Sequence, residues 1–222
     1  MRSLDAVIFD MDGVLIDSEP IWQEAERLRF GEVGLDLDVA EMVTTMGLRV
    51  DEVVAHWYAR RPWPDAGIDH AVLAGRIVDT VVDLVSTGGE PLPGVADAVA
   101  ASAKWGLGLA VASSSPSRVI AAALQRLGLA DRFPVVCSAQ HEPYGKPHPA
   151  VFLSAAAQLG VAPTRCLVVE DSVHGMVAAL AARMHCVVVP DPERSNPRFA
   201  AADHVLDSLE GFPALLEEHY LA

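Results

Sequence analysis

The stretch "AVIFDMDGVLID", residues 6 to 17, begins as an apolar run that Asp10, Asp12 and Asp17 then interrupt. The apolar residues before Asp10 are typical of a buried strand, and Gly13 allows the backbone to turn directly behind the first two carboxylates. Because alternate side chains of an extended chain point the same way, Asp10 and Asp12 are expected on one side. The stretch therefore predicts a strand that ends at a functional site.

Further apolar runs along the chain are also typical of buried strands. They are "LGLAVAS" at 107–113, "FPVVCS" at 133–138, "RCLVVED" at 165–171 and "HCVVVP" at 185–190. Ala- and Leu-rich segments with helical periodicity separate these runs. Short apolar strands that alternate with helices indicate a parallel sheet covered on both faces. We expect an α/β fold with a doubly wound, Rossmann-like parallel sheet.

The segment between the first two expected strands is predicted to be entirely helical. Ser18 can cap a first helix with Pro20 in its first turn, and further helices are expected over 39–46, from residue 50 to 58, and over 68–85. The Gly- and Pro-rich stretch 88–94 is a plausible hinge back into the sheet. We expect a core of residues 1–16 and 87–222 with an inserted α-helical cap of residues 17–86.

Composition limits the possible partners and the cellular location. The formal net charge is −14, which argues against nucleic acid because phosphate backbones are bound by basic surfaces. No apolar run is long enough to span a bilayer, and Asp10 breaks the first run too early for a signal peptide. We expect a cytoplasmic protein with no membrane partner, and nothing requires more than a monomer.

The three cysteines, Cys137, Cys166 and Cys186, lie in separate apolar segments. Their odd number and wide spacing favour buried thiols over a disulfide framework or a metal site.

Polar residues follow four of the expected strands, at the point where each strand ends. They are Asp10 and Asp12 after the first, Ser113, Ser114 and Ser115 after the second, Lys146 in the loop after the third, and Glu170 and Asp171 at the end of the fourth. Any one of these acids could simply form a turn or cap a helix. Together at the carboxyl edge of a parallel sheet they would repel one another unless a cation lay among them, and such oxygen ligands suit Mg²⁺.

Opposite these acids, the sequence offers groups that bind phosphate. Hydroxyls and free N–H groups in "SSSPS", residues 113–117, can bind phosphate oxygens at a helix N-terminus, although the same pattern also serves as an ordinary helix cap. Lys146 in "GKPHP" is one of two lysines in the chain, so its position favours a specific need for an ammonium group.

These segments, in this order, resemble the motifs of the haloacid dehalogenase superfamily. The motifs are "DMDGV", a serine after the second core strand, a lysine before the fourth and an acidic pair after it. The resemblance implies that Asp10 is a nucleophile that forms an aspartyl-phosphate and that Asp12 acts as general acid and then base. Dehalogenating members do not use the second Asp in this way, so the pair favours phosphoryl transfer.

The resemblance also implies the ligands of metal and phosphate. Mg²⁺ would be held by the Asp10 side chain, the Asp12 backbone carbonyl and Asp171. Glu170 is adjacent to Asp171, and in extended geometry its side chain points the other way, so it would support the metal site without direct contact. The hydroxyl of Ser113, the amide of Ser114 and the ammonium of Lys146 would bind phosphate oxygens.

Within the superfamily, the chain looks most similar to the β-phosphoglucomutase-like subfamily, and there to hexitol and 2-deoxyglucose-6-phosphate phosphatases. The similar segments are "DSEPIW", "GLRVDEVVAHWYARRPW", "PYGKPHP" and "VVEDSVHGM". Residues 17–86 contain no lysine, which excludes a phosphonate-cleaving relative that forms an imine there. The mutases carry a cap histidine where this chain has Trp22, and they carry a cap lysine as well.

The resemblance therefore implies a Mg²⁺-dependent phosphatase of small sugar or sugar-alcohol phosphates, with a phosphate monoester as its partner. Trp22 is a candidate for stacking on the sugar, and Glu19 and Arg49 are candidates for hydrogen bonds to its hydroxyls; all could equally be packing residues or solvated charges. Two alternatives stay open at this point. One is a hexose-phosphate mutase, and the other is a phosphosugar-binding regulator without turnover, which two carboxylates facing a phosphate argue against.

Overall fold

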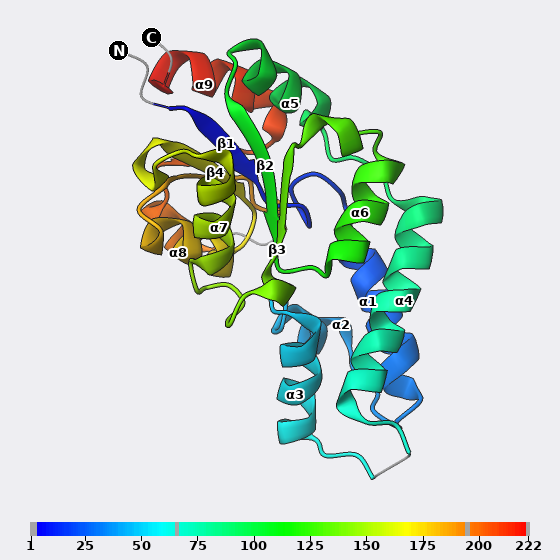
Figure 1. Cartoon of the computed structure of the whole chain (residues 1–222). Helices are drawn as coiled ribbons and strands as arrows, with labels where there is room; N and C mark the ends of the chain where they lie inside the picture. Colours follow the sequence, from blue (N-terminus) through cyan, green and yellow to red (C-terminus); the bar gives the residue numbers. More distant parts are fainter. Residues whose placement is uncertain (1–3, 65–66, 194–195, 221–222) are drawn as a thin grey trace.

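The computed structural model describes residues 4–64, 67–193 and 196–220, and within them six parallel strands form one sheet in the order β3-β2-β1-β4-β5-β6 (Figure 1). The strands are β1 (Ala6–Phe9), β2 (Gly108–Ser113), β3 (Val135–Ser138), β4 (Cys166–Glu170), β5 (His185–Val188) and β6 (His204–Val205). The expected doubly wound sheet is confirmed. In this strand order the winding reverses between β1 and β4, which places the crevice of the sheet at their carboxyl ends.

Alternation along β1 divides the core into two layers. Val7 and Phe9 pack into one hydrophobic cluster, with α5 (Val95–Lys104), α6 (Ser117–Arg126) and α9 (Phe212–Tyr220). Ala6 and Ile8 pack into the other, with α7 (Ala150–Leu159) and α8 (Val173–Ala181). All four side chains of β1 are buried because helices cover both faces of the sheet (Figure 1).

The expected helical cap follows β1 and consists of α1 (Glu19–Gly31), α2 (Val39–Val43), α3 (Val50–Arg60) and α4 (His70–Gly88). It extends from one end of the core (Figure 1). Helix α4 packs against α1 and α3 within the cap and against α6 of the core. Because α4 continues to Gly88, the predicted boundary at residue 87 falls in its last turn, and the division into 1–16, 17–86 and 87–222 stays a prediction.

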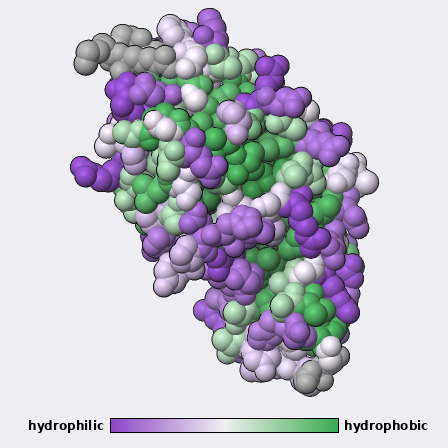
Figure 2. Space-filling model, in the orientation of Figure 1, coloured by the Kyte–Doolittle hydropathy of each residue, from purple (hydrophilic) through white to green (hydrophobic). Residues whose placement is uncertain are grey.

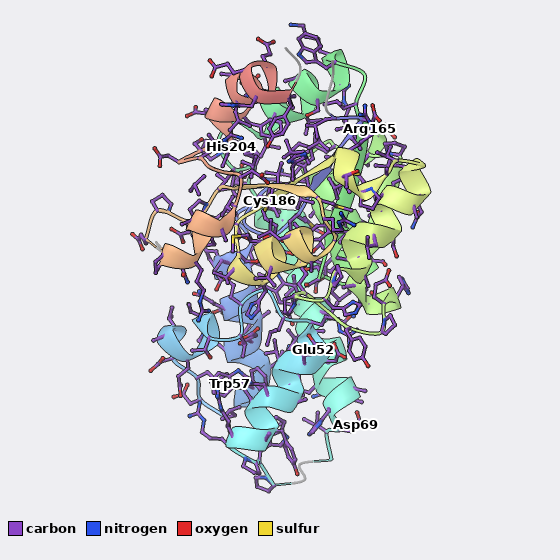
Figure 3. The ribbon with its side chains drawn as sticks, turned by 90° about the vertical axis from the view of Figure 1, so that its left-hand side faces the viewer. Glu52, Trp57, Asp69, Arg165, Cys186 and His204 are labelled. Atoms are coloured by element: carbon purple, nitrogen blue, oxygen red, sulfur yellow. The ribbon has the colours of Figure 1, made fainter. Side chains whose placement is uncertain are left out.

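A cluster of buried aromatic residues gives the cap its own packing. Trp57 and Trp63 are buried, and the Trp63 ring lies 6.0 Å from that of Phe30. Figure 3 shows Trp57 and Glu52 on α3, far from Cys186 in the core sheet. Trp57 is therefore a packing residue of the cap.

Helix α2 is shorter than the predicted helix over 39–46. The hydroxyls of Thr44 and Thr45 donate to the carbonyl oxygens of Glu41 and Met42, at 2.7 and 2.9 Å, and so compete with helix propagation. Gly47 then has a φ of +80°, which ends any helical geometry. Strand β6 was not expected, because two residues leave no periodic pattern in the sequence.

The surface mixes hydrophilic residues with hydrophobic patches over both core and cap (Figure 2). In the part of the chain that the structure describes, no helix has both the length and the apolar character that crossing a bilayer needs. Cys137, Cys166 and Cys186 are buried free thiols, as predicted.

Candidate active site

The carboxyl ends of β1, β2 and β4 meet at a cavity of about 430 Å³ between the sheet and the cap. Asp10 and Asp12 line it directly after β1, and Ser113 lines it at the last position of β2. Lys146 and Asp171 also face this cavity. The structure thus brings together side chains from the four segments that the sequence placed at this edge.

Lys146 is the buried cation of the site. Its side chain is only 2% exposed, and its Nζ lies 2.6 Å from Oε1 of Glu170 and 3.0 Å from Oδ1 of Asp10. Burial alone would lower the pKa of Lys146, but the carboxylates of Asp10 and Glu170 raise it above its usual range. The ammonium therefore stays charged at the end of β1, where it can attract an anion.

Glu170 is a fully buried carboxylate whose oxygens are occupied by protein donors. Oε1 accepts from Lys146, and Oε2 accepts from the backbone N–H of Asp171 and from the N–H and hydroxyl of Ser172, each at 3.0 Å. Burial opposes ionisation, but Lys146 and the Ser172 donors lower the pKa of Glu170 below its usual range. Gly175 of α8 makes room for this carboxylate, since a Cβ there would lie 1.7 Å from Oε1.

Asp10, Glu170 and Asp171 each bring one carboxylate oxygen within 4.8 Å of the others, which is the spacing of metal ligands. Burial, with the neighbouring negative charges, raises the pKa of both Asp10 and Asp171 well above the usual range. A divalent cation bound here would relieve this repulsion, and hard oxygen donors of this kind suit Mg²⁺. Since the oxygens of Glu170 already have partners, Asp10 and Asp171 are the side chains that fit direct contact with the ion.

Gly13 permits the close approach of Asp171. Its φ is +68°, and a Cβ at this position would lie 2.1 Å from Oδ2 of Asp171. The glycine in the opening motif therefore serves both the turn after β1 and the space for a second acid.

Asp12 is held by four side-chain donors. Ser18 donates to Oδ1 at 2.6 Å and the Trp22 indole N–H donates to the same oxygen at 2.9 Å, while Ser113 and Ser115 donate to Oδ2 at 3.2 and 2.6 Å. Two donors come from the cap side and two from the core, so the carboxyl lies where core and cap meet. Ser18 is the N-cap of α1 but makes no capping bond, because its hydroxyl is turned to Asp12.

The serine loop after β2 has donors available for an anion. Ser114 lines the cavity, and within the described residues its buried hydroxyl has no hydrogen-bond partner. Ser138 at the end of β3 fixes the loop by donating to the Ser115 carbonyl at 2.6 Å.

Sequence reasoning missed Ser18 and Ser115 as partners of Asp12. Both serines lie close in sequence to motif residues, and this closeness is the signal that could have indicated their role.

On the cap side, one face of α1 lines the cavity. Glu19 and Trp22, both named from the sequence, lie on it together with Gln23 and Glu26, which were not. The last three of these residues, Trp22, Gln23 and Glu26, follow Glu19 by three, four and seven positions, as one face of a helix requires. The Trp22 indole N–H is already bonded to Asp12, so stacking on a sugar stays a prediction for its ring.

Arg49 is directed away from the cavity. Its guanidinium reaches across to the core and donates to the carbonyl oxygens of Ala139 and Glu142, at 3.3 and 3.0 Å, and it pairs with Asp51 at 2.9 Å. This arrangement favours a bridge between cap and core over the predicted contact with a sugar hydroxyl, because the donors are used by backbone carbonyls.

The chain is similar to known proteins over most of its length. A family model for haloacid dehalogenase-like hydrolases matches residues 4–183. Hexitol phosphatase B of Escherichia coli (strain K12) is 46% identical over 210 residues, which cover 94% of both chains. The structure of CbbY from Rhodobacter sphaeroides in complex with phosphate has a TM-score of 0.87 at 27% identity, covering 93% of this chain and 95% of that one. A beta-phosphoglucomutase from Clostridium difficile has a TM-score of 0.84 at 26% identity, covering 96% of each chain.

Proposed function

The chain belongs to the haloacid dehalogenase-like hydrolase family and is a phosphatase, and we propose that it hydrolyses small sugar or sugar-alcohol phosphates with Mg²⁺, through an aspartyl-phosphate. One observation carries the proposal: Asp10 lies 3.0 Å from a buried lysine at a small-molecule cavity that Asp12 also lines. A phosphosugar-binding regulator without turnover would gain nothing from two carboxylates, Asp10 and Asp12, that face the phosphate, so the regulator alternative is set aside.

Asp10 is the proposed nucleophile. Its carboxylate attacks phosphorus in line, the bond from phosphorus to the ester oxygen breaks, and the leaving alkoxide takes a proton from the Asp12 carboxyl. Asp12 then removes a proton from the water that attacks the phosphoryl group on Asp10, which releases phosphate and restores both side chains. Lys146 and the donors of Ser113 and Ser114 bind the non-bridging oxygens.

Mg²⁺ fits the acidic side of this site. Asp10 and Asp171, with the Asp12 backbone carbonyl, are the proposed ligands, and Glu170 supports them by holding Lys146. When bound, the ion supplies positive charge that offsets the negative charge of the transferring group. The raised pKa of both proposed carboxylate ligands supports a cation at this position.

The substrate class is supported by the hexitol phosphatase relative and by the character of the cavity. Core residues provide the charged end, while α1 provides Glu19, Gln23 and Glu26 on the opposite wall. Polar groups on that wall suit a substrate with hydroxyls beyond the phosphate.

A hexose-phosphate mutase is the second candidate, because a beta-phosphoglucomutase shares the fold at a TM-score of 0.84. Trp22 argues against it. Its indole N–H donates to Asp12, and indole can only donate, so it cannot relay a proton as a histidine could.

The test is phosphate release from hexitol, hexose, pentose and glycolate phosphates, each with Mg²⁺ and with a chelator. We expect hexitol or hexose phosphates to be the best substrates and the chelator to remove activity. Asp10→Asn should abolish turnover, and Asp12→Asn should lower kcat by about 10²–10⁴-fold because general acid-base catalysis is lost. Net isomerisation of a hexose phosphate without free phosphate would establish the mutase instead.

A further inference from the structure

Glu26 is a buried acid in the cavity wall that the proposed chemistry does not use. It lies in the second turn of α1, lines the same cavity as Asp10, and is only 8% exposed. Carboxyl side chains are almost never buried to this degree without a partner. Its placement therefore needs an explanation beyond packing.

Within the described residues, no hydrogen bond or ion pair engages the Glu26 carboxyl. Its neighbour Glu24, on the outer face of α1, pairs with Arg27 at 2.8 Å. Burial, with a further contribution from the negative charge of Glu19, raises the pKa of Glu26 to about 8. At neutral pH the group is therefore an uncharged carboxyl, which can both donate and accept hydrogen bonds.

The position of Glu26 along α1 shows which part of a substrate it meets. The Trp22 indole contacts Asp12 beside the phosphate end of the cavity. Glu26 lies one turn further, about 6 Å along the helix axis. Met42, Val50 and Val53 line the cavity on the facing helices and offer no competing side-chain hydrogen bond.

We infer that Glu26 determines specificity by hydrogen-bonding a hydroxyl group of the substrate at the end remote from the phosphate. The inference rests on the proposed function, since it assumes that phosphate binds at Asp10 and Lys146. A hydroxyl group both donates and accepts, as the uncharged carboxyl does, so the two match. A phosphate ester whose alcohol part carries no hydroxyls would leave the Glu26 carboxyl buried and unpaired, which disfavours binding of that ester.

Paired variants separate hydrogen bonding from packing. Glu26→Gln keeps a donor and an acceptor in a side chain of the same shape, whereas Glu26→Leu removes both and leaves an apolar wall. Glu24→Gln on the outer face of the same helix is the matched control. Thermal unfolding of each variant shows that it is folded before kcat and KM are measured.

The substrates are a hexitol 6-phosphate and phenyl phosphate, which has no hydroxyls. We expect Glu26→Leu to lower kcat/KM for the hexitol phosphate by at least tenfold, mainly through KM, and to leave phenyl phosphate within about twofold. Glu26→Gln should stay within about threefold of the wild-type protein on both, and Glu24→Gln should match it.

Three results would overturn the inference. Equal losses on both substrates in Glu26→Leu would indicate a general structural role, and an unchanged preference for the hexitol phosphate would show that Glu26 makes no contact. A marked preference of the wild-type protein for glucosamine 6-phosphate over glucose 6-phosphate would indicate that the acid pairs with an ammonium group. Failure of the proposed substrate class is seen separately, in the wild-type protein alone, as turnover of phenyl phosphate without turnover of the hexitol phosphate.

Discussion

Lys146 shows how strongly single side chains are constrained in this site. It has two carboxylate partners, and the ring of Phe152 lies 4.8 Å from its Nζ, so the ammonium is enclosed on several sides. Arginine could not replace it, because a planar guanidinium needs more space and more acceptors. Removing one partner of a buried ion pair leaves an uncompensated charge, which costs about 3–5 kcal/mol of stability. The scarcity of lysine elsewhere in the chain makes this position recognisable from the sequence.

Glu26 makes stability depend on pH in a direction that can be tested. The native state holds its proton up to a pKa of about 8, whereas the unfolded chain releases it near the ordinary glutamate value of 4.5. The unfolded state therefore gains stability relative to the native state as pH rises from 4.5 to 8. This loss of native stability is at most about 5 kcal/mol for a shift of this size.

We predict that Glu26→Gln removes this part of the pH dependence. Near pH 5 the free energy of unfolding should be close to that of the wild-type protein, and near pH 8.5 the variant should be the more stable by a few kcal/mol. Urea denaturation at the two pH values measures the difference. The exposed Glu24→Gln control should show no such gain at high pH, and a gain of equal size in that control would contradict the assignment to Glu26.

At the level of elements, the site depends on how closely α8 approaches the end of β4. The Glu170 carboxylate lies against the first turn of α8, where Ser172 is the N-cap and its hydroxyl oxygen accepts a hydrogen bond from the backbone N–H of Gly175 at 3.0 Å. A side chain at Gly175 would overlap Glu170, since its Cβ would lie 1.9 Å from the carboxyl carbon. The helix must therefore carry glycine at this position for the acid and Lys146 to stay paired.

Gly175→Ala should consequently destabilise the protein and reduce activity, because Glu170 must move and Lys146 loses a partner. We expect a loss of about 2–4 kcal/mol in the free energy of unfolding, comparable to overpacking combined with a disturbed buried pair. Gly75→Ala in α4 is the matched control, since a Cβ there meets nothing within 4 Å and alanine favours a helix. The control should be neutral or stabilised by up to about 1 kcal/mol, and similar effects in both variants would contradict this account.

The elements also show what could be predicted from the sequence. Strands β1 to β5 were predicted because apolar runs buried on both faces leave a strong pattern, and parallel topology then places their polar ends together. The partners of individual side chains were not predictable in this way. Glu24 and Glu26 are the same residue type two positions apart, and only the packing of α1 in the folded cap makes one an exposed ion pair and the other a cavity wall.

At the scale of the whole molecule, two arginines form bridges between core and cap. Arg118 of α6 pairs with Asp79 of α4 and donates to the Gly75 carbonyl at 3.1 Å. Arg49, before α3, donates to the core carbonyls of Ala139 and Glu142. A cap held in this way shields the site from water, which strengthens the electrostatic interactions that a phosphoryl transfer needs.

The bridge at Arg49 leads to a prediction that separates cap closure from substrate recognition. Arg49→Met keeps an apolar stem but removes the donors to the core, so closure should weaken for every substrate alike. Hydrogen bonds from a charged donor contribute about 1.5–3 kcal/mol, which corresponds to a loss of roughly tenfold or more in kcat/KM if they form only in the closed state. The measurement is kcat/KM for a hexitol 6-phosphate and for phenyl phosphate.

Arg61→Met is the control for this prediction, because Arg61 pairs with Glu41 at 2.9 Å and donates to the Asp36 carbonyl at 3.3 Å, and among the described residues both partners belong to the cap. A closure role requires the ratio of the two kcat/KM values to stay constant in Arg49→Met while both fall. If instead only the hexitol phosphate is affected, Arg49 contacts the sugar, which is one of the two interpretations that the sequence left open. Glu26→Leu should change that ratio and Arg49→Met should not, so the two variants together assign recognition to α1 and closure to the start of α3.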